Sequence, residues 1–278
     1  MKKNIFVLTS LMLTLGCGCD SFLDETNYSD VTSEGGYYDT EAGLNAVVNA
    51  CYTPLRFWAG KEDAIGLSET GTDIIAAGSG CVDNNMAAYT QSLDGTNSAC
   101  TFYFDRFYAA INWCNTAIFH AQTVPNPSND EILATTLNKR EAEARVLRTF
   151  YYWILTETFG DIYYTDQPST SIVMNPVKTS TDNIYQYMFD DLDWAIKSKL
   201  STLQNDGGRV TIWTAKALKA RLLLTRASEK NDVDMYGQAY DLAKDVIENG
   251  PFELAEDFAS IWDMKNSDGN SNKEAVSY

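Results

Sequence analysis

The stretch NKREAEARVLRTFYYWILTETFGD, residues Asn138–Asp161, decides the fold class of this chain. Its apolar residues recur at intervals of three and four, which is the spacing of one face of an α-helix. Gly160 follows the last turn of this pattern, at the position where a glycine commonly ends a helix. The stretch therefore predicts one long helix.

The same helical period returns on both sides of this stretch, and no long alternating pattern typical of a strand interrupts it. Pro125 and Pro127 end the preceding helix because proline cannot continue one. We predict further helices over residues 41–59, 102–122, 180–200, 211–230 and 234–254. The fold class is therefore predicted to be mainly α.

Two of these helices resemble one another. Ala142, Ala144 and Arg148 recur 73 residues later as Ala215, Ala217 and Arg221. The tetratricopeptide period is about 34 residues, so this shift is close to two periods plus a short insertion. Small alanines let antiparallel helices approach, and large side chains fill the holes between them. We expect TPR-like helix pairs within one larger domain.

The segment from Gly60 to Ala99 has a different composition. It is rich in Gly, Ser, Thr, Asn and Asp, and GSGCVDNN and SLDGTNS within it mark turns. A loop of this length in a compact domain is usually functional or disordered. It is the first place to look for a ligand site.

The N-terminus has the features of an export signal. Lys2 and Lys3 precede an apolar segment, Ile5–Leu15, which is too short to span a bilayer. Two glycine–cysteine pairs then follow, in which a small residue directly precedes Cys17 or Cys19. This arrangement resembles the lipobox of bacterial lipoproteins, in which the cysteine becomes lipidated. An ordinary secreted protein with two incidental cysteines is the alternative.

Charge excludes one class of function. The 278 residues contain 38 acidic against 21 basic side chains and have a formal net charge of -17. Such a chain repels phosphate backbones, so we expect no nucleic-acid partner. Attachment to a membrane would have to come from the lipid anchor.

The remaining cysteines show no metal or redox motif, since none lies in a CxxC pair. Cys51 and Cys114 fall within apolar helical patterns and are predicted to be buried free thiols. Cys81 and Cys100 flank a turn-rich stretch and could form a disulfide in an exported protein.

No catalytic constellation is apparent. The single histidine, His120, lies on a predicted helix without a matched carboxylate or nucleophile. Asp190, Asp191 and Asp193 are interpreted as a solvated helix face rather than a glycosidase pair. We predict no enzyme, no metal site and no cofactor.

Three segments together resemble one protein family. They are CDSFLD at residues 19–24, FDRFYAAINWCNTAI at 104–118 and ARVLRTFYYWILTETFGD at 144–161. In this order they look like the SusD/RagB family, the surface nutrient-binding lipoproteins of Bacteroidetes. The resemblance implies a SusD-like helical domain with long ligand-binding loops. It also implies a lipid-anchored protein at the outer membrane that passes glycans to a SusC-like, TonB-dependent barrel.

The resemblance also implies boundaries. Mature chains of the family begin with Cys followed by a segment like this one, so we favour Cys19 over Cys17 as the lipidated residue. Residues 1–18 are then the signal peptide, and residues 19–278 form one domain. Family members are longer and continue past the motif NKEAVSY at 272–278, so we expect the domain to be C-terminally incomplete.

A glycan site needs flat aromatic rings beside polar groups, because sugar rings present apolar faces edged with hydroxyls. The Gly60–Phe104 segment and its flanks supply both kinds of side chain. The candidate ligand residues are Trp58, Asp73, Asn84, Tyr89, Phe102 and Tyr103. The tryptophans at helical spacing, Trp113, Trp153, Trp194 and Trp213, are predicted to be core residues.

Two functional hypotheses follow. The first is a surface glycan-binding lipoprotein that works with a transporter, or a variant of it that captures peptides. The second is a TPR-like lipoprotein whose partners are other proteins. An exposed aromatic platform in the early loop would favour the first, whereas contacts on the concave solenoid face would favour the second.

Overall fold

The computed structural model describes residues 37–59, 62–76, 78, 84–91, 93–126, 128–203, 208–263 and 273–274. The chain divides into two compact units, Met1–Tyr37 and Tyr38–Tyr278, and the fold described here is that of the second. The predicted lipid-attachment residues Cys17 and Cys19 lie outside the described residues, as does Cys81 of the possible disulfide.

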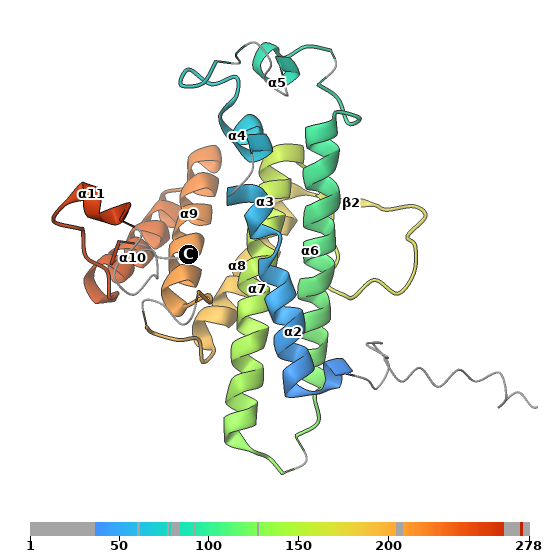
Figure 1. The fold of residues 1–278 in the computed structure, drawn as a ribbon, viewed down its shortest axis with the longest axis vertical. Helices are drawn as coiled ribbons and strands as arrows, with labels where there is room; N and C mark the ends of the chain where they lie inside the picture. Colours follow the sequence, from blue (N-terminus) through green and yellow to red (C-terminus); the bar gives the residue numbers. More distant parts are fainter. Residues whose placement is uncertain are drawn as a thin grey trace, which may run out of the picture. The chain divides into compact units, whose positions relative to one another are not determined.

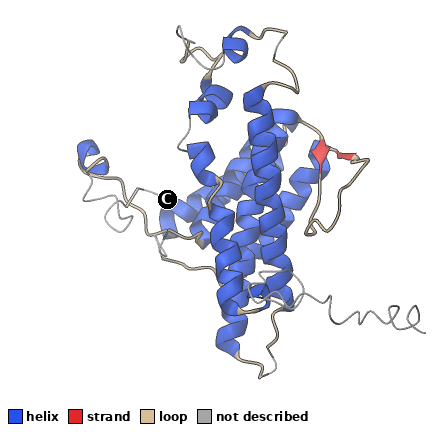
Figure 2. Cartoon of the chain, turned by 45° about the vertical axis from the view of Figure 1, so that its right-hand side comes forward, coloured by secondary structure: helices blue, strands red, loops and turns tan. Residues whose placement is uncertain are grey.

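The second unit is built almost entirely of helices (Figures 1 and 2). Two strands of two residues each, β1 (Ile162–Tyr163) and β2 (Lys178–Thr179), pair antiparallel, with Ile162 opposite Thr179. The helices are α2 (Glu41–Tyr52), α3 (Leu55–Ala59), α4 (Glu62–Glu69), α5 (Asn84–Ala88), α6 (Ser98–Thr123), α7 (Glu131–Phe159), α8 (Thr181–Lys197), α9 (Ile212–Lys230), α10 (Val233–Asn249) and α11 (Phe258–Ile261), preceded by the 3-10 turn η2 (Tyr37–Asp39). The prediction of a mainly α fold is confirmed.

The deciding stretch forms the C-terminal part of α7, the longest of these helices. Asp130 caps its N-terminus by accepting hydrogen bonds from the backbone N–H groups of Ile132 and Leu133. Gly160 ends it with a φ of 71°, a conformation that glycine adopts without steric cost. The prediction at this end of the helix is therefore confirmed.

Two local predictions need correction. The helix expected over residues 41–59 is divided into α2 and α3, because Pro54 has no N–H group to continue the hydrogen-bond ladder. The segment expected to be a loop, from Gly60 to Ala99, contains two short helices, α4 and α5. The helices α4 and α5 both contribute residues to the candidate site described below.

The long helices pack side by side in chain order. α7 packs against α6 and α8, α9 packs against α8 and α10, and α2 lies against both α6 and α7 (Figure 1). Ala142, Ala144 and Ala215 are completely buried, which fits the close approach predicted for TPR-like pairs. The repeat inferred from the sequence thus corresponds to the successive pairs α7–α8 and α9–α10.

The core confirms some predicted positions and corrects others. Cys51 and Cys114 are free and fully buried, as predicted, and Cys100 is half-buried. Trp213 is buried, but Trp113 is 39% exposed, so its assignment to the core was wrong. Trp113 lies on the face of α6 turned away from Cys114 and its buried neighbours, which helical spacing alone did not distinguish.

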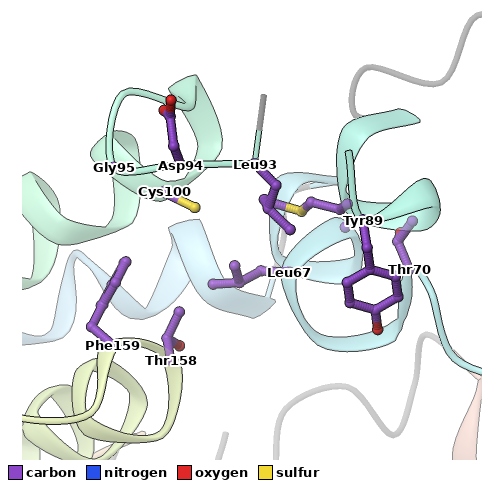
Figure 3. Close-up of a pocket in the computed structure, with 11 residues that line it drawn as sticks. Leu67, Thr70, Tyr89, Leu93, Asp94, Gly95, Cys100, Thr158 and Phe159 are labelled. Atoms are coloured by element: carbon purple, nitrogen blue, oxygen red, sulfur yellow. The ribbon is translucent and has the colours of Figure 1, made fainter. Parts of the chain in front are cut away.

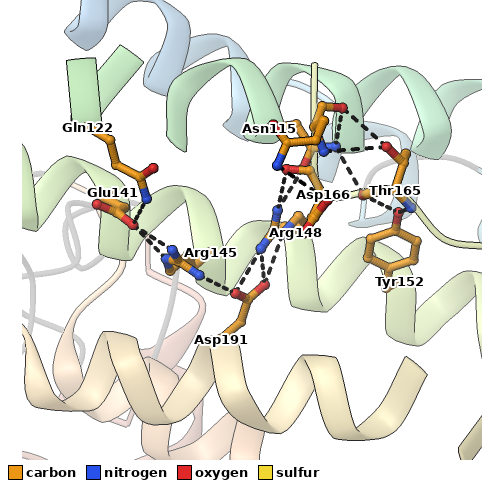
Figure 4. Close-up of polar contacts among 10 residues, drawn as sticks. Asn115, Gln122, Glu141, Arg145, Arg148, Tyr152, Thr165, Asp166 and Asp191 are labelled. Carbon is orange, nitrogen blue, oxygen red and sulfur yellow. Dashed lines mark hydrogen bonds and ion pairs between the residues drawn. The ribbon is translucent and has the colours of Figure 1, made fainter. Parts of the chain in front are cut away.

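A buried ionic network joins α6, α7 and α8 (Figure 4). The Arg148 guanidinium donates to Asp191 Oδ2 at 2.9 Å through Nε and to Oδ1 at 2.8 Å. Arg145 also donates to Asp191, at 2.6 Å. Asp191 is buried, so the prediction that it belongs to a solvated face was wrong, whereas its neighbour Asp190 is exposed. A carboxylate needs such partners to remain charged when it is buried.

The same network anchors the connection between β1 and β2. Asn115 accepts a hydrogen bond from Arg148 at 2.8 Å, and its amide group donates to the backbone oxygens of Thr165 and Gln167 at 3.1 Å each. The Tyr152 hydroxyl donates to Thr165 O at 2.8 Å and accepts from Thr165 N at 2.9 Å. The start of this long connection is therefore fixed to the helical core (Figure 4).

Candidate functional site

A pocket of about 500 Å³ opens among α4, α5, the N-terminal end of α6 and the C-terminal end of α7 (Figure 3). Its walls combine apolar and polar side chains. The lining residues are Gly66, Leu67, Thr70, Met86, Tyr89, Leu93, Asp94, Gly95, Cys100, Thr158 and Phe159. The pocket thus lies where the early segment meets the long helices, and its volume falls in the range of small-molecule sites.

Tyr89 provides the most exposed aromatic ring of the pocket. Its side chain is 71% exposed, and its backbone has a φ of 48°, a left-handed conformation that is unusual for a bulky residue. The Tyr89 hydroxyl donates to Gly71 O at 3.4 Å. A Cβ atom at Gly71 would lie 3.0 Å from Met86 O and 3.1 Å from the Tyr89 hydroxyl, so the turn at Gly71 allows the ring to approach.

The opposite rim of the pocket is a tight polar turn. Asp94 Oδ1 accepts hydrogen bonds from the backbone N–H and the hydroxyl of Thr96, at 2.8 and 2.6 Å. These hydrogen bonds lower the pKa of the Asp94 carboxyl below its usual value. Asn97 then caps α6 by accepting from Ala99 N at 3.0 Å. In Figure 3 the Asp94 carboxylate points away from Leu67, toward the outer side of the pocket.

The floor of the pocket is apolar. Figure 3 shows Leu67 projecting between the end of α7, which supplies Thr158 and Phe159, and the segment that carries Leu93. The Cys100 side chain lies beside this floor. The arrangement offers an apolar base, one exposed ring and a charged rim, which suits a ligand with both apolar faces and polar edges.

Within the described part of the chain, no group of three or more His, Cys, Asp or Glu side chains is arranged to hold a metal ion. His120 lies elsewhere, buried at the other end of α6, where its Nδ1 is 2.8 Å from Asp39 Oδ1. This contact ties the start of the second unit to α6, so we assign His120 a structural role.

The structure distributes the predicted ligand residues over three places. Tyr89 lines the pocket, Asp73 is exposed but does not line it, and Asn84 is the first residue of α5. Trp58 and Phe102 instead belong to an aromatic cluster around Tyr103, with ring centroids 5.8 and 5.3 Å from the Tyr103 ring.

Tyr103 itself is a core residue. Its side chain is completely buried, and its hydroxyl donates to Phe57 O at 3.1 Å. A ring enclosed in this way offers no face to a ligand, so the site proposed below does not include Tyr103. The sequence placed it next to Phe102 but could not show how far each ring is enclosed: consecutive helical residues are about 100° apart, and here Tyr103 is buried whereas Phe102 is only half-buried.

Several pocket residues were missed by reasoning from the sequence. Asp94 lies in the turn motif SLDGTNS, but the motif was interpreted only as a chain reversal. Phe159 belongs to the end of the deciding helix, and only tertiary packing brings it to the pocket. Leu67 is on α4, a helix that the polar composition of its surroundings concealed.

The chain is similar to proteins of one kind. A curated SusD-like protein of Bacteroides ovatus is 26% identical over 291 residues, covering 99% of this chain and 49% of that protein. A solved SusD homolog from Bacteroides thetaiotaomicron has a TM-score of 0.70 at 23% identity, covering 83% of this chain and 44% of the other. A solved laminarin-binding SusD-like protein has a TM-score of 0.68 at 21% identity, covering 82% and 49%. The chain spans about half the length of the curated relatives it matches.

A family model adds the decisive match. The family is described as starch-binding and associating with the outer membrane, and its model matches residues 72–276. None of the helices that the structure describes is both long and apolar enough to cross a bilayer. Since the matched segment includes most of the chain, from the early segment through α10, the chain belongs to the SusD-like family.

Proposed function

We propose that this protein is a cell-surface lipoprotein that binds glycans and delivers them to a SusC-like, TonB-dependent transporter in the outer membrane. The observation that carries the glycan part is the pocket of about 500 Å³, which combines the exposed Tyr89 ring with the Asp94 rim. Family membership supports the same conclusion, because the family is described as starch-binding.

The geometry around Tyr89 suits a sugar. A sugar ring can lie on a flat aromatic face while its hydroxyl groups reach hydrogen-bond acceptors nearby, and a carboxylate with a lowered pKa stays an acceptor at neutral pH. Tyr89 is held in an uncommon backbone conformation with its ring largely exposed. Such local strain is often retained at ligand sites, where the surrounding structure stabilises it.

The membrane part of the proposal has separate support. The N-terminal leader with its Gly-Cys pairs suits a lipid anchor at Cys19, or at Cys17 as the alternative. The family is described as associating with the outer membrane. A lipid-anchored binding protein would need a transporter to move its ligand inward, and the SusC-like barrel fills that role in our proposal.

Laminarin and starch are the first ligands to test. One structural neighbour is named as laminarin-binding, and the family is described as starch-binding. We would titrate the chain from Asp20 onward, together with any coding sequence that follows residue 278 in the gene, with oligosaccharides of both glucans by calorimetry. Tyr89→Ala should weaken binding about tenfold, the loss of about 1.4 kcal/mol expected for an aromatic contact.

Tyr240→Ala is the matched control, because Tyr240 is also an exposed tyrosine, at 64%, but lies on α10 away from the pocket. Its substitution should leave the affinity unchanged. Equal losses in the two variants would contradict the assignment of the pocket. Absence of binding to any glycan by a folded, complete chain would favour peptide capture or protein interaction instead.

A further inference from the structure

Most of the arginines that the structure describes in this acidic chain form ion pairs with its own carboxylates. The arginines Arg140, Arg145, Arg148, Arg209 and Arg226 all form ion pairs with carboxylates. Arg106, near the N-terminal end of α6, has no carboxylate or hydrogen-bond partner among the described residues, and its side chain is exposed. A guanidinium left unpaired in a chain with a net charge of -17 needs an explanation.

Arg106 is held by two aromatic rings. Its Cζ atom lies 5.1 Å from the centroid of the Phe57 ring and 5.4 Å from that of Phe102. The two rings are 5.7 Å apart and nearly perpendicular, at 87°, so they form a corner for the guanidinium. Because the Tyr103 hydroxyl binds Phe57 O at 3.1 Å, α3 and α6 hold this corner together.

Cation–π contacts of this kind position the guanidinium without neutralising it. Such contacts use no hydrogen bond, so the five N–H donors at the edge of the guanidinium stay available to other partners. The edge can therefore donate two parallel hydrogen bonds to a carboxylate or sulfate, the geometry in which arginine binds oxyanions best.

We propose that Arg106, on the corner formed by Phe57 and Phe102, binds an oxyanion of an acidic glycan, either a uronate carboxylate or a sulfate ester. The inference rests on the proposed function for the glycan, and it adds the chemical class. Phe102 is one of the ligand residues predicted from the sequence, and Arg106 is four residues further along the same helix. The acidic net charge of the chain repels anions overall, so an acidic glycan would need a local cation such as this arginine.

The position of Arg106 is compatible with an extended ligand. Cys100, which lines the pocket, and Arg106 are six residues apart on α6, a rise of about 9 Å along the helix axis and a rotation of about 120° around it. An oligosaccharide that begins in the pocket would therefore place a charged substituent at Arg106 by following the surface of α6 part of the way around. The pocket would bind the uncharged sugar rings, and Arg106 would bind the charged substituent.

The test is calorimetric titration of the same complete chain with three probes, which are oligogalacturonate, a sulfated carrageenan oligosaccharide and a neutral laminarin oligosaccharide. Arg106→Met keeps an unbranched apolar stem on the two rings and removes the charge. It should weaken binding of one acidic probe at least tenfold and leave laminarin binding unchanged. The probe that responds distinguishes carboxylate from sulfate.

Arg221→Met is the matched control. Arg221 is also exposed, has its Cζ 4.9 Å from the Trp153 ring centroid and has no carboxylate partner among the described residues, but it lies on α9. Its substitution should change none of the affinities. An equal affinity of wild type and Arg106→Met for both acidic probes, or no binding of either, would overturn the inference. In that case retained laminarin binding, sensitive to Tyr89→Ala, would leave the proposed function standing.

Discussion

Arg148 and Arg221 occupy equivalent positions in the repeat, yet the structure gives them different surroundings. Arg148 is 3% exposed and binds Asp191 and Asn115, whereas Arg221 is exposed on the outer face of α9. Arg148→Met would leave a buried carboxylate with only Arg145 as its partner. Because breaking a buried ion pair is strongly destabilising, we expect a loss of about 3–5 kcal/mol in the free energy of unfolding.

Denaturant unfolding monitored by circular dichroism would measure this loss, with Arg221→Met as the control. The surface substitution should change stability by less than about 0.5 kcal/mol. If the two substitutions proved equally mild, the network in Figure 4 would not stabilise the fold as described.

The same pair of arginines shows where prediction from the sequence stops. The 73-residue shift correctly identified repeated helix pairs, because small and large apolar residues recur in both. It could not distinguish a buried arginine from an exposed one, since that depends on whether a neighbouring helix supplies a carboxylate. For the same reason Asp191 was misjudged, because its neighbours Asp190 and Asp193 are indeed not buried.

At the scale of elements, the connection between β1 and β2 depends on contacts made at its first residues. Tyr152 is almost fully buried, and its hydroxyl both donates to and accepts from the backbone of Thr165. Tyr152→Phe would leave both backbone groups of Thr165 without this partner, at an expected cost of about 1–3 kcal/mol. We expect faster amide hydrogen exchange in the 163–178 segment, measured by mass spectrometry.

Tyr187→Phe provides the comparison for this experiment. Tyr187 stacks on Tyr164 at a centroid distance of 4.4 Å and is 39% exposed, so its ring contributes packing near the same connection. Its substitution should leave exchange unchanged. Unchanged exchange in both variants would mean that the hydroxyl of Tyr152 does not hold the connection.

Element boundaries were predictable where local chemistry decides them and not elsewhere. The end of α7 at Gly160 was found because helix caps have their own residue preferences. The short helix α4 was missed because it contains Gly66 and polar residues and is stabilised by packing against α3 and α6 rather than by its own propensity. The pocket depends on α4, so its lining could not be listed in advance.

At the scale of the whole molecule, family and fold could be predicted from the sequence, whereas the site could be predicted only as a region. Two of the three family motifs lie on α6 and α7, whose packing is dictated by their own residues. The pocket lies in the expected early segment, but it takes Phe159 from α7 and excludes Trp58 and Tyr103. Which side chains face a pocket depends on helix rotation, and a polar segment carries no periodic pattern that would fix it.

The buried tyrosines give the molecule a predictable response to alkaline pH. Burial is the largest cause that raises the pKa of six described tyrosines above the ordinary value of 10.0, and it raises the pKa of Tyr164 to about 12. The six are Tyr52, Tyr108, Tyr151, Tyr152, Tyr164 and Tyr185. For Tyr52 and Tyr185 the nearby carboxylates of Glu143 and Glu157 add to this effect. Just above about pH 10, these phenols therefore stay protonated in the folded state, whereas the same groups are already ionised in the unfolded chain.

The sign of the resulting stability change follows from linkage. A group whose folded pKa lies above its unfolded pKa contributes full stability below the unfolded value, here about 10, and loses it as pH rises further. At about pH 11 each of the fully buried phenols of Tyr151, Tyr152 and Tyr185 should cost roughly 1 kcal/mol. We expect the melting temperature to be insensitive to these groups up to about pH 9 and to fall steeply above about pH 10.

Tyrosinate absorbance from these residues should appear together with the loss of helical circular dichroism, because ionisation requires their exposure. If all sixteen tyrosines of the chain titrated while the helices stayed intact, the aromatic core described here would be wrong.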